Sequence, residues 1–296
     1  MAAGDGEREP KIFECVPNVS EGRDANVLDA CARAIEGAGV ALANRTSDAA
    51  HHRSVFTFFG PRDEVRAAAL ALARVTTERI DLRLHRGAHP RIGALDVLPF
   101  VGFGSATLED AIALARDAAH DIWRELGVPS VFYGVAATSE RRRLLADVRA
   151  GEFEGLAERG HRGGPPDVGD VAAHPGAGAV AIGARGPLVA FNIVLATGDL
   201  GLARSIARTI RERGGGFRTL RALGIAQADG LVQVSCNLTD VEATPLHRVV
   251  AVVRLLASAA GVAIARTELI GLVPRAALER VAEAALGIEV LSHTTQ

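Results

Sequence analysis

Apolar residues recur at helical spacing in several parts of the chain. Over residues 22–39 they fall at every third or fourth position and the segment ends in glycines, which predicts an amphipathic helix. A second helix is expected after Pro61, and a third after Thr107, which can form a capping box with Asp110. Further helices are expected over residues 139–149, 199–213, 245–260 and 274–286.

Strand-like runs lie between these helices, and several are apolar enough to be buried on both faces of a sheet. In the first half they span residues 11–16, 40–46, 54–59, 96–103 and 129–135. In the second half, residues 179–184 and 188–195 flank the turn Arg185-Gly186-Pro187, and residues 220–226 and 231–236 flank Ala228-Asp229-Gly230. Turns of this kind are typical of hairpins, so each pair is expected to be antiparallel.

The irregular alternation of strands and helices predicts an α/β (α+β) protein with two subdomains, each a mixed sheet packed with helices. Residues 151–178 are rich in Gly, Pro, Asp and His and carry little hydrophobic periodicity, which indicates a seam between the subdomains. The expected parts are a disordered tail over 1–10 and subdomains over 11–177 and 178–290. The seam is either a plain linker or, because clefts between domains often bind ligands, a binding segment that carries His161 and His174.

Composition excludes several classes of protein. The 296 residues include 33 basic and 35 acidic side chains, so no strong positive field exists to hold nucleic acid. No apolar run approaches the ~20 residues of a membrane span, and the polar start does not resemble a signal peptide. We therefore expect a cytoplasmic protein without nucleic-acid or membrane partners. Three separated cysteines predict neither a disulfide framework nor a zinc site.

The segment HRGAHPRIGALDV, residues 85–97, concentrates groups capable of proton transfer. Pro90 favours an extended conformation at His89, and the neighbouring glycines permit tight turns, so the imidazole can be presented at the entrance of a strand. Histidine can accept and release a proton near neutral pH, and Asp96 could orient it. The competing interpretation is a loop histidine that caps a carbonyl.

Two other polar clusters precede or follow strands. In DAAHHRS, residues 48–54, His51 and His52 point to opposite sides of an extended chain and cannot chelate one metal ion. Arg53 can bind a carboxylate with two hydrogen bonds or form an ordinary surface ion pair. In CVPNVSEGRD, residues 15–24, Asn18 and Ser20 lie near the start of a helix, where they either attract an anion or act as caps.

Three blocks of the sequence are similar to one known family. ECVPNVSEGRD at 14–24, HRSVFTFFG at 52–60 and GAHPRIGALDVLPF at 87–100 resemble the formiminotransferase family. Further blocks match in the same order, so that the resemblance covers nearly the whole chain: GVAAT, RAGEFEGL, AIGAR, LVAFNIVL, QVSCNLTD and LIGLVP.

The resemblance implies transfer of the formimino group from N-formimino-L-glutamate to tetrahydrofolate, giving 5-formiminotetrahydrofolate and L-glutamate in histidine degradation. It implies tetrahydrofolate as co-substrate, no metal, a substrate groove between two subdomains, a homodimer and a monofunctional enzyme. His89 is the implied catalytic residue. The implied folate-binding residues are Gly169, Asp170, Val171, Ala172, Ala173, His174, Pro175, Gly176, Ala177 and Gly178. The expected substrate contacts are Asn18, Asp48, Arg53, Arg91, Asp96, Arg185 and Asn192, with the arginines as carboxylate anchors.

Two departures from the family pattern and three alternatives accompany this expectation. The folate segment has His174 and small residues where some relatives place aromatics. Relatives often carry an acidic residue near the end of the strand over 40–46, where this chain has Asn44 and Thr46, so that Asp48 is the nearest carboxylate. The alternatives are formyl transfer from N-formylglutamate, a non-catalytic folate-binding protein, and a metal hydrolase. The hydrolase would use His51, His52, His85 and His89.

Overall fold

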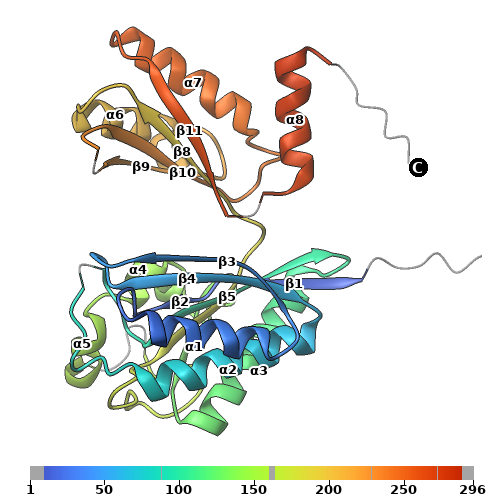
Figure 1. Cartoon of the computed structure of the whole chain (residues 1–296), viewed down its shortest axis with the longest axis vertical. Coiled ribbons are helices and arrows are strands. Elements are labelled where there is room, and N and C mark those ends of the chain that lie inside the picture. The colour runs from blue at the N-terminus through green and yellow to red at the C-terminus, as the bar shows by residue number, and fades with distance from the viewer. Residues whose placement is uncertain (1–9, 88, 160–163, 228, 272, 289–296) are drawn as a thin grey trace, which may run out of the picture. The chain divides into compact units, whose positions relative to one another are not determined.

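The computed structural model divides into two compact units, Met1–Gly186 and Pro187–Gln296 (Figure 1). It describes residues 10–87, 89–159, 164–227, 229–271 and 273–288. Apart from Pro10, the predicted disordered tail lies outside the described residues, as does His161. The predicted fold class is confirmed, because each unit consists of a sheet covered by helices.

The first unit is built on a seven-stranded sheet. Its strands are β1 (Lys11–Cys15), β2 (Asn18–Val19), β3 (Ala41–Asp48), β4 (Arg53–Gly60), β5 (Leu95–Gly104), β6 (Ser130–Gly134) and β7 (Val180–Ala184). Both β1 and β2 pair with β4 on one side and β5 on the other, and all these pairs are antiparallel. β7 lies between β5 and β6 and is parallel to both.

Three helices cover one face of this sheet: α1 (Ala25–Glu36), α2 (Arg62–Arg79) and α3 (Leu108–Leu126) (Figure 1). The side chain of Asp24 caps α1, and the predicted capping box of Thr107 and Asp110 begins α3. Their apolar faces bury the large core residues of the unit, which include Phe13, Phe56, Phe58, Leu98 and Phe100. A smaller cluster that includes Ile92, Val97, Leu156 and Ala181 is buried separately.

The second unit has a four-stranded antiparallel sheet in the order β11-β8-β10-β9. Its strands are β8 (Val189–Leu195), β9 (Leu220–Ala226), β10 (Val232–Leu238) and β11 (Ile264–Ile270), and its helices are α6 (Leu200–Ile210), α7 (Leu246–Ala259) and α8 (Arg275–Leu286). The unit has its own core, in which Ile193, Val234 and Leu238 are fully buried. None of the described helices is both long enough and apolar enough to cross a membrane.

The structure corrects one of the two predicted hairpins. β9 and β10 form the expected antiparallel pair, whereas β7 and β8 belong to different sheets. All five residues of β7 are buried, and such a strand needs neighbours on both edges and cover on both faces. It therefore lies between β5 and β6. The chain divides into the two units after it, between Gly186 and Pro187, whereas the expected division was between 177 and 178.

Two further segments differ from the sequence pattern. The helix expected over 139–149 is replaced by a short 3-10 turn, Glu140–Arg142, and the single helical turn α4 (Leu145–Val148). The segment read as a seam between subdomains contains the helix α5 (Glu152–Arg159) and lies within the first unit. The isolated bridges of Val168 with Ser130 and of Gly178 with Gly93 hold its second half against that unit.

Candidate active site

A proline breaks one strand of the first sheet into β1 and β2, and the break positions two polar side chains. Pro17 has no N–H to donate to the strand ladder, although its carbonyl accepts a hydrogen bond from the N–H of Phe56. Asn18 follows directly and accepts hydrogen bonds from Nε and Nη2 of Arg53. Ser20 donates from Oγ to the carbonyl of Gly93 at 2.7 Å, which fixes the loop before β5.

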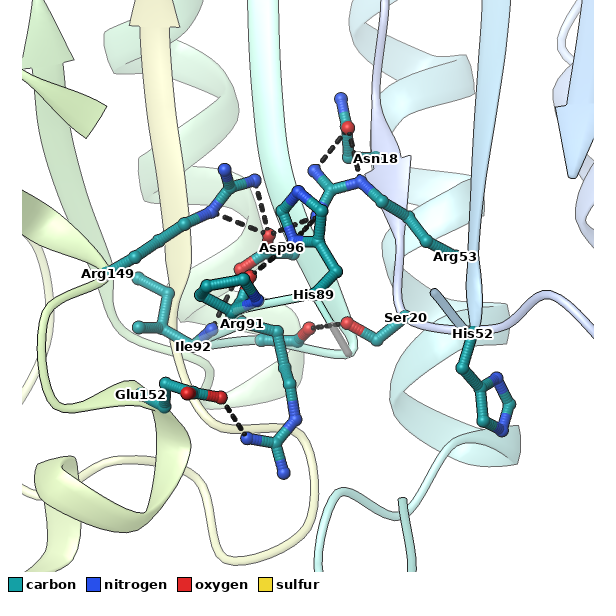
Figure 2. A network of polar contacts seen from close by, with 12 residues as sticks. Asn18, Ser20, His52, Arg53, His89, Arg91, Ile92, Asp96, Arg149 and Glu152 are labelled. Atoms are coloured by element: carbon teal, nitrogen blue, oxygen red, sulfur yellow. Dashed lines mark hydrogen bonds and ion pairs between the residues drawn. The ribbon is translucent and has the colours of Figure 1, made fainter. Parts of the chain in front are cut away.

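Asp96, near the start of β5, is the buried centre of the polar network in Figure 2. Its Oδ1 accepts a hydrogen bond from the N–H of Ile92 at 2.8 Å. Its Oδ2 accepts from Nη1 of Arg53 at 3.2 Å and from Nε and Nη2 of Arg149 at 3.0 and 2.6 Å. Two guanidinium groups from opposite sides therefore converge on one carboxylate oxygen.

His89 is half-buried beside this carboxylate, in contact with Arg53. Its Nδ1 lies 2.7 Å from Nη1 of Arg53 and 2.7 Å from the carbonyl oxygen of Pro90. Burial lowers the pKa of His89, and the positive charge of Arg53 lowers it further. The imidazole is therefore neutral at neutral pH, which is the form that can accept a proton. We refer to Asn18, Arg53, His89, Asp96 and Arg149 as the Asp96 cluster.

A cavity of about 320 Å³ opens beside the Asp96 cluster. It is lined by Thr46, Ser47, Asp48, His51, Arg53, Val55 and His89. Asp48 ends β3 and is paired with His51, with Oδ2 and Nδ1 at 2.7 Å, and hydrogen bonds from His51 lower the pKa of this carboxyl. The carboxylate nearest the end of this strand thus lines the same cavity as His89.

Arg91 points away from Asp96 toward α5, as Figure 2 shows. Its guanidinium donates to Glu154 at 2.7 and 2.8 Å and to Glu152 at 2.9 Å, and its Nε donates to His85. The hydrogen bonds from Arg91 lower the pKa of Glu154 to about 2. Two carboxylates already neutralise this arginine, and it links the His89 loop to α5.

The four histidines of the metal-hydrolase alternative form two separate pairs. The rings of His52 and His85 lie 4.3 Å apart, and those of His51 and His89 lie 6.4 Å apart. His52 accepts a hydrogen bond from the N–H of Gly22, and its ring points away from the Asp96 cluster in Figure 2. In the described part of the chain, no three His, Cys, Asp or Glu side chains are grouped so that they could hold a metal ion.

The predicted folate segment, residues 169–178, is hydrogen-bonded to the loop that carries His89. The N–H of Ala94 donates to Ala177, and the N–H of Ala179 donates to Ile92, both at 2.9 Å. Gly93 and Gly178 form an isolated antiparallel β-bridge between these two hydrogen bonds. The two backbones are so close there that a Cβ on Gly178 would lie 2.1 Å from the carbonyl oxygen of Ile92. The two segments therefore form one rigid edge.

An apolar cavity of about 530 Å³ lies along the folate segment. Residues 171–175 form one wall of it, and Phe153 and Leu156 of α5 form another. A buried ion pair fixes the start of the segment, because Nη1 of Arg142 donates to Asp167 at 2.7 Å and both side chains are less than a tenth exposed. The cavity has the apolar lining that a flat heterocycle needs.

Two of the expected substrate contacts lie elsewhere. Arg185 follows the end of β7, where burial lowers its pKa and the negative charge of Glu14 partly offsets this effect. Asn192 is on β8 in the second unit, between Ser235 and Glu268 of the neighbouring strands. By contrast, Asp48, Arg53 and His89 line the cavity beside β3, and Asn18 and Asp96 are hydrogen-bonded to Arg53.

The residue that the sequence analysis missed is Arg149, which completes the Asp96 cluster. It follows a single turn of helix and belongs to no periodic element. The one available signal was its position at the start of the block RAGEFEGL, quoted above only for its resemblance.

Comparisons with known proteins agree over nearly the whole chain. Residues 12–185 match the model of the formiminotransferase domain, N-terminal subdomain, and residues 190–291 match that of the formiminotransferase domain. The chain is 41% identical over 291 residues to a glutamate formimidoyltransferase of Streptococcus pyogenes serotype M1, with 97% of each chain covered. It is 38% identical to a glutamate formimidoyltransferase of Thermoplasma acidophilum, with 92% of this chain and 91% of the relative covered. A formimidoyltransferase-cyclodeaminase of Gallus gallus is 40% identical, and the match covers 92% of this chain and 52% of that protein.

Proposed function

The chain belongs to the formiminotransferase family, and from this premise we propose that the Asp96 cluster is the active site of a glutamate formimidoyltransferase. The reaction moves the formimino group of N-formimino-L-glutamate to tetrahydrofolate in histidine degradation. Its products are 5-formiminotetrahydrofolate and L-glutamate. The observation that carries the assignment is a half-buried histidine held against a buried Arg53–Asp96 pair beside an open cavity.

The chemistry requires one proton to move between two amines. The formimino carbon is electrophilic because its nitrogen is protonated, and the N5 amine of the folate attacks this carbon to form a tetrahedral intermediate. The bond from this carbon to the glutamate nitrogen then breaks. His89 accepts the proton that N5 loses and delivers it to the departing glutamate amine, a role typically worth ~10²- to 10⁴-fold in rate.

The contacts of His89 suit this shuttle. When Nδ1–H donates to the carbonyl of Pro90, the lone pair of Nε2 is free to act as the base. Arg53 lies on the same Nδ1 side of the ring, and burial together with its positive charge keeps the imidazole neutral until the proton arrives. Asp96 in turn fixes Arg53, because its oxygen accepts a hydrogen bond from Nη1.

Tetrahydrofolate is the co-substrate, and we assign its ring system to the cavity beside residues 169–178. Hydrogen bonds tie this segment to Ile92 and Ala94, three and five positions beyond His89. Phe153 offers an aromatic face at the same cavity. No observation favours the formyl-transfer, metal-hydrolase or non-catalytic alternatives.

Turnover by the purified protein tests this function. With N-formimino-L-glutamate and tetrahydrofolate, we expect the absorbance of the folate product to rise and L-glutamate to accumulate in equal amount. His89→Gln should retain folate binding and lose most of the rate. Absence of turnover with both substrates present would contradict the assignment, and faster turnover with N-formylglutamate would replace it with formyl transfer.

The working form that we propose is a homodimer in the cytoplasm. Support comes from the family resemblance and from β9, an edge strand of its sheet on which Leu223 and Ile225 are exposed. Sedimentation equilibrium should give twice the chain mass of 30.9 kDa. A mass of one chain at micromolar concentration would exclude the dimer.

A further inference from the structure

The Asp96 cluster carries more positive than negative charge on side chains that are mostly buried. Two guanidinium groups, of Arg53 and Arg149, share one carboxylate, that of Asp96. The side chains of Arg53 and Arg149 are 11% and 12% exposed, and that of Asp96 is fully buried. Because His89 is neutral, the group keeps one uncompensated positive charge. A buried charge without a partner is costly, so the arrangement is suited to an anionic ligand.

A second pair of arginines meets one aspartate at Asp121, and it differs from the Asp96 cluster in exposure and in a further carboxylate. There Arg66 and Arg124 both donate to Asp121 on the helical side of the unit. These two arginines are 33% and 67% exposed, and Glu125 lies 3.7 Å from Nη2 of Arg124. At Asp96 both arginines are little exposed, so a bound anion is a suitable partner for the excess positive charge.

The free hydrogen-bond donors show which arginine faces the ligand. In Arg53, Nε and Nη2 donate to Asn18, and Nη1 contacts both Asp96 and His89. Arg149 uses Nε and Nη2 for Asp96, and no contact within the described residues occupies its Nη1. A guanidinium has five N–H groups, and three of those of Arg149 remain. One on Nη1 and one on Nη2 are parallel, which is the geometry that binds a carboxylate.

We propose that Arg149 binds a glutamyl carboxylate of a substrate through its Nη1 edge, with Asp96 holding the guanidinium in place. The inference rests on the proposed function for the identity of the anion, because both substrates of that reaction carry glutamyl carboxylates. Arg91 is unsuited to the role, since Glu152 and Glu154 neutralise it. Arg149 is therefore a substrate-binding residue that the predicted set lacked.

Calorimetric titration of Arg149→Gln tests the proposal without requiring turnover. One arm uses L-glutamate, a second uses tetrahydrofolate, and a third uses a tetrahydropteroate that lacks the glutamyl tail. Losing a charge-assisted pair should weaken binding of the ligand that Arg149 anchors by about 10- to 100-fold. Weaker L-glutamate binding assigns the carboxylate to the donor. Weaker tetrahydrofolate binding, with tetrahydropteroate unchanged, assigns it to the folate tail. Unchanged affinity for both would overturn the proposal.

Two further variants separate binding from folding. Arg66→Gln removes an arginine from the comparable Asp121 group and should bind all three ligands as wild type does. Arg149→Lys keeps the charge but loses the planar fork, so it should weaken the same ligand less than Arg149→Gln does. It supplies the test if Arg149→Gln does not fold. Wild-type affinity in Arg149→Lys would then count against the proposal.

Kinetics distinguish this inference from the proposed function. If wild type binds L-glutamate through Arg149 but transfers no formimino group, the function fails and the anion site stands. If wild type transfers the group and Arg149→Gln has unchanged KM for both substrates, the function stands and the anion site fails. The expected result is a KM raised about 10- to 100-fold for one substrate, with a smaller change in kcat.

Discussion

His89 lies against Arg53, and this contact decides the pH range in which the imidazole can act as a base. Burial lowers the pKa of His89 first, and the charge of Arg53 lowers it further. A histidine with a lowered pKa is unprotonated above that pKa and loses its function as a base only when the pH falls through it. Its ordinary pKa is near 6.5, so the base should remain active across neutral pH.

The pH dependence of kcat/KM tests this account. We expect kcat/KM to rise with pH through a midpoint below 6.5 and then to level off toward neutral pH. Arg53→Met removes the neighbouring charge and should move this midpoint to higher pH. His89→Gln should lower kcat by ~10²- to 10⁴-fold and abolish the rise of kcat/KM on the acidic side of the profile. A midpoint above 6.5, or an unchanged rise of kcat/KM with pH in His89→Gln, would show that another group titrates.

The sequence nominates single residues only where their chemistry is visible locally, and their roles stay predictions. The glycines and proline around His89 mark a presented loop, and an arginine directly before a strand, as at Arg53, marks a candidate anchor. Arg149 has no such mark. Its role depends on the approach of Asp96, 53 positions away in sequence, to its Nε and Nη2. Such a contact exists only once the tertiary fold has formed.

Elements were predictable where their ends carry their own signals. The capping box at Thr107 satisfies the first N–H groups of α3 regardless of the rest of the fold. The interpretation of β7 and β8 as a hairpin failed because Arg185-Gly186-Pro187 resembles a turn locally. Pairing in a sheet is not local, and β7 has parallel partners on both edges instead. The pairing of β11 with β8 was also not predictable, because no turn in the sequence connects these two strands directly.

The contact between the His89 loop and the folate segment yields a prediction at the level of elements. A Cβ on Gly93 would lie 2.1 Å from the carbonyl oxygen of Ala179, so Gly93→Ala must push the two segments apart. We expect a lower Tm and a raised KM for tetrahydrofolate, because the segment moves relative to His89. Gly155→Ala is the matched control, since a Cβ there meets nothing within 4 Å and alanine favours a helix. Equal Tm and KM in the two variants would contradict this account.

At the level of the whole molecule, the number of units was predictable and their boundary was not. The low hydrophobic periodicity over residues 151–178 indicated a seam, yet that segment packs within the first unit. Gly and Pro in a sequence mark irregular backbone and do not show whether it is exposed. Here the irregular backbone is held by buried groups, such as the pair of Arg142 and Asp167, and it borders the proposed folate cavity.

The two units have separate cores, and this makes their stabilities separable. Leu98 belongs to the core of the first unit and Leu238 to that of the second, and both are fully buried. Replacing such a leucine with alanine leaves a cavity and typically costs 2–5 kcal/mol, as a general magnitude for buried leucines. Where two units share little core, this cost falls on one of them.

We therefore expect thermal unfolding of the whole chain to resolve into two transitions, measured by calorimetry. Leu98→Ala should lower the temperature of one transition and leave the other in place, and Leu238→Ala should do the reverse. The Asp96 cluster and residues 169–178 lie in the first unit. Bound tetrahydrofolate should therefore raise the temperature of only that transition whose temperature Leu98→Ala lowers. A single transition lowered equally by both variants would mean that the units unfold cooperatively.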